Sequence, residues 1–390
     1  MLLKDKIVAI VGAGPGGLTL ATLLQQKGIN IQIYERDADK DARQQGTTLD
    51  LHEDSGLKAL RIAGLMDEFK KRYRPGADKM RITDKEGNIL FDDHTVKSEE
   101  DFGSIHFRPE IDRGPLRHML IESLQPGTIQ WNARFTGMNP KDAGWELHFD
   151  NHPSAYADLV VAADGANSKL RKYITDIQPI YSDITMVEGN IHQAESNAPK
   201  LWELVKGGKI FALGSEKTLI LGAKGDGTLS FATGVKEPES WAKHSNIDFA
   251  SREQVRDWFM ATFADWGQAW HELFFSDDAW YIPRPMYHFP LDQRWSSKPN
   301  LTMIGDAAHR MPPYAGEGVN QAMQDALELY EALCLQAHKT IPDAIESFEK
   351  VMCERAGKIT DESLRSTEMM HAPDGLDNLL RFFNREGDVL

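Results

Sequence analysis

The sequence predicts an α/β protein in which a parallel sheet flanked by helices is combined with an inserted antiparallel sheet. Continuous apolar runs at Ile7–Val11, Leu159–Ala162 and Leu301–Ile304 are typical of strands buried on both faces of a parallel sheet. Between about 176 and 281, short apolar or alternating segments separated by glycines favour antiparallel strands. From Gly318 onward, apolar residues recur at helical spacing.

The first run opens a strand-helix-strand unit of about 30 residues. A helix-period segment extends from Leu18 to Lys27, and Gly28 supplies its C-terminal stop. Alternating isoleucines from Ile29 then form a second strand that ends near Tyr34. After this unit, we expect one helix with apolar residues from Leu57 to Leu65, and a helix over 115–124. A hairpin is expected from strands at 80–83 and 89–91.

The turn inside this unit carries the spacing Gly12-x-Gly14-x-x-Gly17. The first glycine permits a tight turn, the second lets backbone N–H groups approach a pyrophosphate, and the third lets helix and strand pack closely. The following helix directs its positive end at the phosphates. A glycine-rich turn without a ligand is the alternative, but the flanking strand and helix favour a Rossmann-like dinucleotide site.

An acid stands where such a site needs one. Glu35 ends the second strand, 23 residues after Gly12 (35 − 12), and can accept hydrogen bonds from ribose hydroxyls. Arg36 beside it is either a solvated side chain or a second partner of the nucleotide.

Two more turns place a carboxylate directly after a buried strand. Asp164 lies in the segment Ala163-Asp164-Gly165-Ala166-x-Ser168-x-x-Arg171, where it either binds a ligand or braces the turn. Asp306 lies in Gly305-Asp306-Ala307-Ala308-His309, before a helix N-terminus, where it can cap backbone donors or receive a ligand hydroxyl. His309 is either packed or functional, and we assign it no chemistry.

These three turns, in this order, resemble the fingerprints of the class A flavoprotein monooxygenases, the family of para-hydroxybenzoate hydroxylase. The resemblance covers nearly the whole chain. Within the family, the sequence is most similar to the tetracycline-inactivating monooxygenases. The similar stretches are Leu24-Gln25-Gln26-x-Gly28-Ile29, Tyr34-Glu35-Arg36-Asp37, Thr48-Leu49-Asp50-Leu51-His52 and Met303–His309 with Met311-Pro312-Pro313.

The resemblance implies FAD and NADPH as cofactors. It implies FAD contacts for Asp50, Arg113 and Asp306, an NADPH contact for Arg43, and a role in both sites for Asp164. Arg113 could instead pair with a neighbouring acid, Asp112 or Glu110, and Arg43 could be merely solvated. The turn from Pro312 to Asn320 would pass close to the flavin ring, with contacts from Pro313, Gly316, Gly318 and Asn320; a rigid connection is the alternative.

The implied reaction is hydroxylation of an electron-rich carbon by a flavin C4a-hydroperoxide, formed from NADPH and dioxygen, so we assign no catalytic side chain. Family positions that contact tetracycline carry different residues here: Glu188, Lys209, Phe211, Ser230 and Ala232 replace Gln, Arg, Met, His and Gly. Tyr314 is a further candidate for substrate contact. We therefore expect a planar phenolic or enolic aromatic or polyketide-type substrate, and tetracycline itself is less favoured.

The motifs divide the chain into three parts. The FAD-binding domain is expected to comprise 1–72, 97–175 and 282–340, and the substrate domain 73–96 and 176–281. Helices in 341–390 would bridge the two. Their apolar stripe, which serves packing, the substrate or both, is Met369, Met370, Leu376, Leu379, Leu380 and Phe382.

Composition excludes several other classes. A net charge of -15 disfavours nucleic acids and anionic membranes as partners. No window is apolar enough to span a membrane and no signal peptide is visible, so we expect a cytoplasmic protein. We further expect a monomer. Cys334 and Cys353 are expected to be reduced. We find no metal-ligand spacing and no hydrolase nucleophile motif.

Two alternative functions remain open. A flavin-dependent reductase or dehydrogenase of the same fold would use the same cofactor turns without inserting oxygen. A flavin-free binding protein is a third reading, and the intact Gly12, Gly14, Gly17, Glu35 and Asp306 argue against it.

Overall fold

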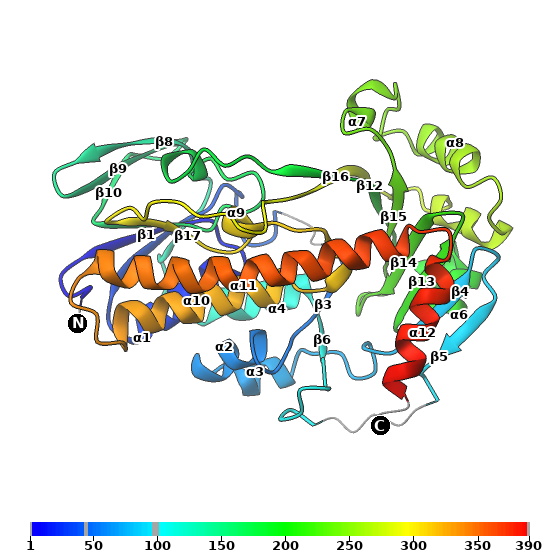
Figure 1. The fold of residues 1–390 in the computed structure, drawn as a ribbon, viewed down its shortest axis with the longest axis horizontal. Helices are drawn as coiled ribbons and strands as arrows, with labels where there is room; N and C mark the ends of the chain where they lie inside the picture. The colour runs from blue at the N-terminus through cyan, green and yellow to red at the C-terminus, as the bar shows by residue number, and fades with distance from the viewer. Residues whose placement is uncertain (1, 43–45, 96–100, 388–390) are drawn as a thin grey trace.

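The computed structural model describes residues 2–42, 46–95 and 101–387. A five-stranded parallel sheet lies in the left half of Figure 1, with strand order β17-β11-β1-β2-β7. The three predicted apolar runs form its adjacent strands β17, β11 and β1, and these strands are almost completely buried. The strands are β1 (Ile7–Val11), β2 (Asn30–Tyr34), β7 (Ile129–Gln130), β11 (Leu159–Ala162) and β17 (Leu301–Met303).

Helices cover one face of this sheet, and a small antiparallel sheet packs over the other (Figure 1). The glycines of α1 permit close contact with α10, because a Cβ at Gly16 would lie 2.8 Å from the carbonyl oxygen of Ala322. The helices are α1 (Pro15–Gln26), α2 (Gly56–Ile62), α3 (Met66–Lys70), α4 (Arg113–Glu122), α9 (Asp306–His309) and α10 (Gly318–Cys334), with a 3₁₀ turn η1 (Arg171–Tyr173). The small sheet is β8 (Arg134–Lys141), β9 (Gly144–Asp150) and β10 (Ala155–Ala157).

Three parts of the fold differ from the sequence predictions. The single helix expected from Leu57 to Leu65 is two helices, because Gly64 adopts a positive φ of 70° between α2 and α3. The small sheet β8–β10 was not predicted, and neither was the two-stranded ribbon of β3 (Thr48–Asp50) and β6 (Glu110–Asp112). β3 and β6 have only three residues each, too few to show an apolar period, and β8 and β9, although eight and seven residues long, bury only two residues each.

A seven-stranded sheet forms the second part of the fold, with strand order β16-β12-β15-β14-β13-β4-β5. All neighbours are antiparallel except β13 and β4, which are parallel, so the expected inserted sheet and its hairpin are confirmed. The strands are β4 (Met80–Asp84), β5 (Ile89–Asp92), β12 (Ile180–Ile191), β13 (Lys209–Gly214), β14 (Lys217–Ala223), β15 (Leu229–Lys236) and β16 (Tyr281–His288).

The outer face of this sheet is covered by short helices whose aromatic and aliphatic side chains form a second core, including Leu201, Phe259 and Trp270. These helices were not predicted within the antiparallel region. They are α5 (Ala194–Asn197), α6 (Pro199–Val205), α7 (Trp241–His244), α8 (Arg252–Thr262) and η2 (Gln268–Phe274). The opposite, inner face of the sheet carries a third cluster of apolar side chains, to which the C-terminal helices also contribute.

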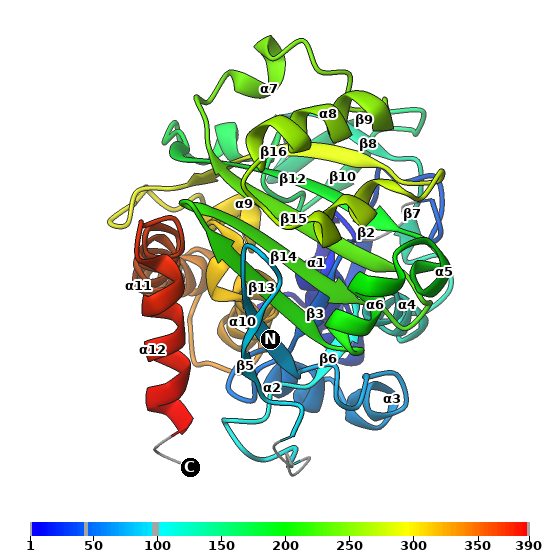
Figure 2. The same ribbon diagram turned by 90° about the vertical axis from the view of Figure 1, so that its right-hand side faces the viewer.

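The C-terminal helices connect the two sheets. In Figure 1, α11 (Ile341–Met370) runs alongside α10 and on to the seven-stranded sheet, where α12 (Gly375–Gly387) follows. Figure 2 shows α12 beside the ends of β13 and β14, and α12 contacts β13. The apolar stripe lies in the third cluster with one correction: Phe382 is 50% exposed, and Phe383 packs inward instead.

Within the described part of the chain, no helix has the length and apolar character needed to cross a membrane. Both cysteine thiols are free.

Candidate active site

The glycines of the first turn have different surroundings. A Cβ at Gly12 would lie 2.2 Å from the carbonyl oxygen of Ala163, and one at Gly17 would lie 2.3 Å from that of Gly12. These two residues allow β1, α1 and β11 to pack closely. A Cβ at Gly14 would meet nothing within 4 Å. The N-terminus of α1 therefore borders open space, which is where a pyrophosphate would need to approach the backbone.

Glu35 closes this turn from the end of β2. Its Oε2 accepts a hydrogen bond from the backbone N–H of Ala13 at 2.6 Å, and Oε1 accepts one from Asp37 at 3.0 Å. Each carboxylate oxygen can accept a second bond, so a ribose hydroxyl is still compatible with this geometry. Arg36 is exposed beside it. Arg43 lies outside the described residues.

Asp164 follows β11 and has one unused oxygen. Its Oδ2 accepts a hydrogen bond from the N–H of Lys169 at 2.8 Å, while Oδ1 is buried without a partner among the described residues. Burial raises the pKa of this carboxyl. A buried polar atom without a partner is costly, so Oδ1 marks a place where a ligand donor would fit.

The turn after β17 is held by Asp325, a buried side chain of α10. Its Oδ2 accepts the N–H of Gly305 at 2.7 Å and lies 2.6 Å from His309 Nε2; Arg355 donates to Oδ1 at 2.7 Å. Burial alone would raise the pKa of Asp325, but the charges of His309 and Arg355 hold it at about 2. His309 is thus a packed residue that fixes the turn, while Asp306 is exposed at the start of α9.

The turn expected near the flavin ring is anchored to the seven-stranded sheet. Tyr314, in η3 (Pro313–Ala315), places its hydroxyl 3.2 Å from Thr218 Oγ1 and 3.3 Å from His371 Nε2. Tyr314 is buried, and burial raises its pKa. Its neighbours Pro313, Gly316 and Gly318 are exposed. The turn therefore presents backbone outward, and its aromatic ring acts as the anchor.

Asn320 ties the β3 segment to this turn. Its Nδ2 donates to the carbonyl of Asp50 at 3.0 Å, and its Oδ1 accepts the N–H of His52 at 2.9 Å. The side chain is fully buried, so Asn320 orients Asp50. The Asp50 carboxylate lies directly beneath the turn, since a Cβ at Gly316 would be 3.4 Å from Oδ1.

A charge cluster surrounds Asp50. His52 Nε2 lies 3.0 Å from Asp50 Oδ2, and its Nδ1 lies 3.3 Å from Glu317 Oε1. Burial would lower the pKa of His52, but the two carboxylates raise it to about 9, so the imidazole is a cation at neutral pH. Burial opposes ionisation of Asp50, yet His52 and Lys209 lower its pKa to about 2.

Arg113 begins α4, directly after β6. Both acids offered as its alternative partners are engaged by other residues. Glu110 forms an ion pair with Lys209, and Asp112 accepts the N–H of Gly225 at 2.9 Å and pairs with Arg74 at 3.5 Å. A carboxylate can accept several hydrogen bonds, so these contacts do not decide between a protein partner and a cofactor for Arg113, and its role stays a prediction.

The predicted substrate residues share the inner face of the seven-stranded sheet. One cross-strand row on this face runs from Phe211 through Ile220 and Ala232 to Glu188. The next row on the same face contains Lys209 and Ser230. This is the face that carries Thr218, the partner of Tyr314. The structure thus brings the candidate flavin turn and the candidate substrate residues together. Tyr314 is buried between them and offers little surface to a substrate.

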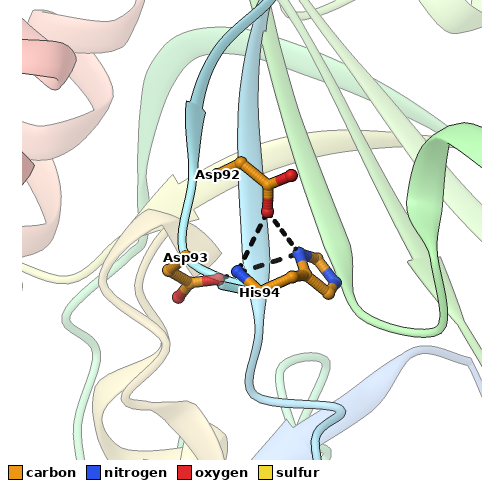
Figure 3. A group of neighbouring side chains, drawn as sticks. All are labelled: Asp92, Asp93 and His94. Carbon is orange, nitrogen blue, oxygen red and sulfur yellow. Dashed lines mark hydrogen bonds and ion pairs between the residues drawn. The ribbon is translucent and has the colours of Figure 1, made fainter. Parts of the chain in front are cut away.

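Asp92, Asp93 and His94 form a separate cluster at the end of β5, shown in Figure 3. Asp92 accepts hydrogen bonds from the backbone and Nδ1 of His94, and it also pairs with Arg81 at 3.0 Å. Asp93 accepts the N–H of Met80 at 2.7 Å. The carboxylates therefore close a turn and neutralise an arginine, an arrangement that needs no metal.

Sequence reasoning missed His52, Glu110, Glu317 and Asp325. A signal existed for two of them. Asp50 and His52 are two residues apart, which on a strand places them on one face. Asp325 stands between Ala322 and Leu329 at apolar helical positions, where an acid needs a buried partner. Glu110 and Glu317 carry no such local signal, because their partners are distant in sequence.

Comparison with known proteins identifies the family. A family model described as an FAD binding domain matches residues 5–363. A monooxygenase of Emericella nidulans, asqM, is 30% identical and covers 85% of this chain and 84% of its own length. A 3-amino-4-hydroxybenzoate 2-monooxygenase of Streptomyces platensis, PtmB3, is 27% identical, with coverage of 96% and 91%.

Solved structures share the fold. Klebsiella pneumoniae HpxO, complexed with FAD and uric acid, matches with a TM-score of 0.76 at 22% identity, covering 98% of this chain and 94% of that one. The tetracycline destructase Tet(51) matches with a TM-score of 0.72 at 17% identity, covering 98% and 95%. The chain belongs to the FAD-binding family of the class A flavoprotein monooxygenases, as the resemblance of its three turns predicted.

Proposed function

We propose that the protein is an FAD- and NADPH-dependent monooxygenase that hydroxylates a planar phenolic or enolic aromatic or polyketide-type compound. The observation that carries this proposal is the direct connection between the Pro313–Gly316 turn and the inner sheet face, through Tyr314 and Thr218. A flavin ring on that turn would lie beside the substrate residues. Family membership supports the same reaction class.

The residues present fit an FAD molecule. Open space at Gly14 accommodates the pyrophosphate, and Glu35 retains acceptor capacity for the ribose. Asp164 Oδ1 lacks a partner among the described residues, and Asp306 is exposed at a helix N-terminus. We assign the pyrophosphate to the first turn, the ribitol to Asp306, a further contact to Arg113, and the ring to the Pro313–Gly316 turn.

FAD, when bound and reduced by NADPH, supplies activation of dioxygen and oxygen transfer. The chain's own residues orient the reactants and exclude water. Asp50 is fixed beneath the turn by Asn320 and His52, so its negative charge stays in one place. The apolar side chains of Ile220 and Phe211 line the sheet face, where water would compete with the substrate.

The domain division extends this proposal. Residues 1–72, 97–175 and 282–340 would hold FAD, 73–96 and 176–281 would hold the substrate, and 341–390 would close the space between them. The packing of α11 on α10 and of α12 on β13 supports the bridging role.

The decisive experiment measures oxygen insertion. Holoenzyme is incubated with NADPH, labelled dioxygen and a panel of phenols, naphthols and polyketides, and products are analysed by mass spectrometry. We expect NADPH consumption coupled to one labelled oxygen in the product. Reduction of a carbon–carbon bond without label would favour a reductase instead, and protein that binds no FAD would favour a binding protein.

Two variants test the cofactor assignments separately. Asp306→Ala should lower FAD affinity by about 1–3 kcal/mol, the scale for removing a partner of a buried polar group.

Arg43→Ala should raise the KM for NADPH by roughly 10- to 150-fold at unchanged FAD content, because a charge-assisted bond to phosphate is lost. Equal FAD affinity in the first variant, or an equal KM in the second, would remove that residue from the site.

A further inference from the structure

The inner face of the seven-stranded sheet holds no uncompensated positive charge. Its strands, all within the described residues, carry three lysine or arginine side chains on this face: Lys209, Lys236 and Arg284. Each is paired with an acid. Lys209 pairs with Glu110, Lys236 with Glu216 at 2.5 Å, and Arg284 with Glu188.

The Lys209 pair adjoins the Pro313–Gly316 turn, because Lys209 also interacts with Asp50 beneath Gly316. Glu110 is almost completely buried, with 1% of its side chain exposed, while Lys209 is 24% exposed. The ammonium group is therefore held from the protein side by a carboxylate that solvent cannot screen. A ligand carboxylate would have to compete with this bond, and such charge-assisted bonds are the strong ones.

The surrounding cluster adds no positive charge. Its cations are Lys209 and His52, with Arg108 acting on Glu317, and its acids are Asp50, Glu110 and Glu317, with Asp78 acting on Lys209, so four acids face three bases. Burial raises the pKa of Glu110. If that carboxyl is protonated, three carboxylates still balance three cations. A carboxylate brought to this face would thus meet balanced or excess negative charge, and it would lose its hydration without compensation.

Resting on the monooxygenase function proposed above, we propose that Glu110 and Lys209 together determine substrate class: this site takes an uncharged phenol or enol and rejects the ring-carboxylate analogue of the same compound. Lys209, which by resemblance is a substrate contact, acts here as the partner of Glu110. The neighbouring part of the inner sheet face is apolar and suited to a neutral aromatic ring; it is formed by Phe211, Ile220 and Ala232.

The test uses FAD-loaded enzyme and matched probes that differ only by a carboxylate: 2-aminophenol with 3-amino-4-hydroxybenzoate, and 2-naphthol with 6-hydroxy-2-naphthoate. Binding is followed by the change in flavin absorbance near neutral pH. We expect the uncharged member of each pair to bind at least about 10-fold more tightly. Glu110→Gln should free Lys209 and raise affinity for the carboxylate member by about 10-fold or more.

The double variant Glu110→Gln/Lys209→Met is the matched control, and it should lack the gain because the freed cation is gone. If Glu110→Gln does not fold with bound FAD, Glu188→Gln frees Arg284 in the same way and should shift affinity in the same direction. An equal or higher affinity of the parent for the carboxylates would overturn the inference, and so would Glu110→Gln without any gain.

Oxygen insertion, measured separately with labelled dioxygen, keeps the two proposals apart. If the carboxylate probes bind well and are hydroxylated, the inference that the site rejects carboxylates is contradicted and the monooxygenase proposal stands. If no probe is oxygenated but Glu110→Gln gains carboxylate binding, the inference stands and the monooxygenase proposal is contradicted for these compounds.

Discussion

At the scale of single residues, the three motif glycines have separable physical roles. Gly12 and Gly17 are required by protein packing, since a side chain at either would collide with backbone. Gly14 has an ordinary backbone conformation, with φ −81° and ψ 174°, and faces open space. Its requirement for glycine must come from something outside the chain, and the pyrophosphate is the natural candidate.

Gly14→Val should therefore fold but fail to bind FAD, while Gly17→Val should fail to fold. The apo melting temperature of Gly14→Val is expected to match that of the parent, because no protein atom beyond the adjoining residues lies within 4 Å of the new Cβ. Flavin content is measured by absorbance after reconstitution, and folding by circular dichroism. A folded Gly14→Val with full flavin content would overturn the assignment of this turn.

His52 should make the free energy of unfolding fall as the pH rises from neutral into the alkaline range. Its folded pKa of about 9 lies above the ordinary value of 6.5, so its contribution is complete below about pH 6.5 and lost as the pH rises through about 9. The expected loss is on the order of 3 kcal/mol. His52→Gln should flatten the melting temperature over this range, relative to the parent. Parallel curves for the two proteins would show that His52 does not carry the charge.

At the scale of elements, the Pro313–Ala315 turn docks on the sheet where β15 has no side chain. A Cβ at Gly234 would lie 2.3 Å from the Tyr314 hydroxyl and 2.4 Å from Thr218 Oγ1. Gly234→Ala should destabilise the protein by about 1–3 kcal/mol, the scale of overpacking, and lower FAD affinity by moving the turn. Gly222→Ala, whose nearest contact would be 3.8 Å away, is the matched control and should change little. Equal effects of the two would show that this docking is loose.

The amphipathic helix α12 offers a second test. Leu379 is 2% exposed in the inner cluster, and Phe382, one turn further along the helix, is 50% exposed. Leu379→Ala should cost about 2–5 kcal/mol in urea unfolding, if α12 packs as firmly as a core helix. Phe382→Ala should stay within about 0.5 kcal/mol. Loss of the difference between them would mean that α12 leaves the sheet in solution.

At the scale of the whole molecule, the parallel strands and the glycine turn could be predicted because their signals are local. Each buried strand is a continuous apolar run, and each turn follows directly. The sheet face that gathers Glu188, Lys209 and Ser230 was expected only through the family resemblance. The pairing of Lys209 with Glu110 could not be predicted, since 99 residues separate them and neither position has a distinctive neighbourhood.

The proposed FAD contacts all lie on the parallel-sheet side, and this has a consequence for unfolding. Ligand that binds only the folded state stabilises it, by about 2.7 kcal/mol at 100 times Kd. That stabilisation reaches the seven-stranded sheet only through shared contacts, of which the Tyr314, Thr218 and His371 hydrogen bonds are central. Six of the nine tryptophans lie between positions 202 and 280, so tryptophan fluorescence reports mainly on the seven-stranded sheet and its helices.

In the parent, we therefore expect tryptophan fluorescence and release of fluorescent flavin to change at one temperature, which rises with free FAD. Tyr314→Phe keeps the ring but removes both hydroxyl bonds, each worth about 0.5–1.5 kcal/mol. In this variant the tryptophan transition should move below the flavin transition and respond less to FAD. Thr218→Val, which removes one of the two partners, should give an intermediate separation. If the two transitions stay together in Tyr314→Phe, the coupling between the sheets is carried by α11 and α12 instead.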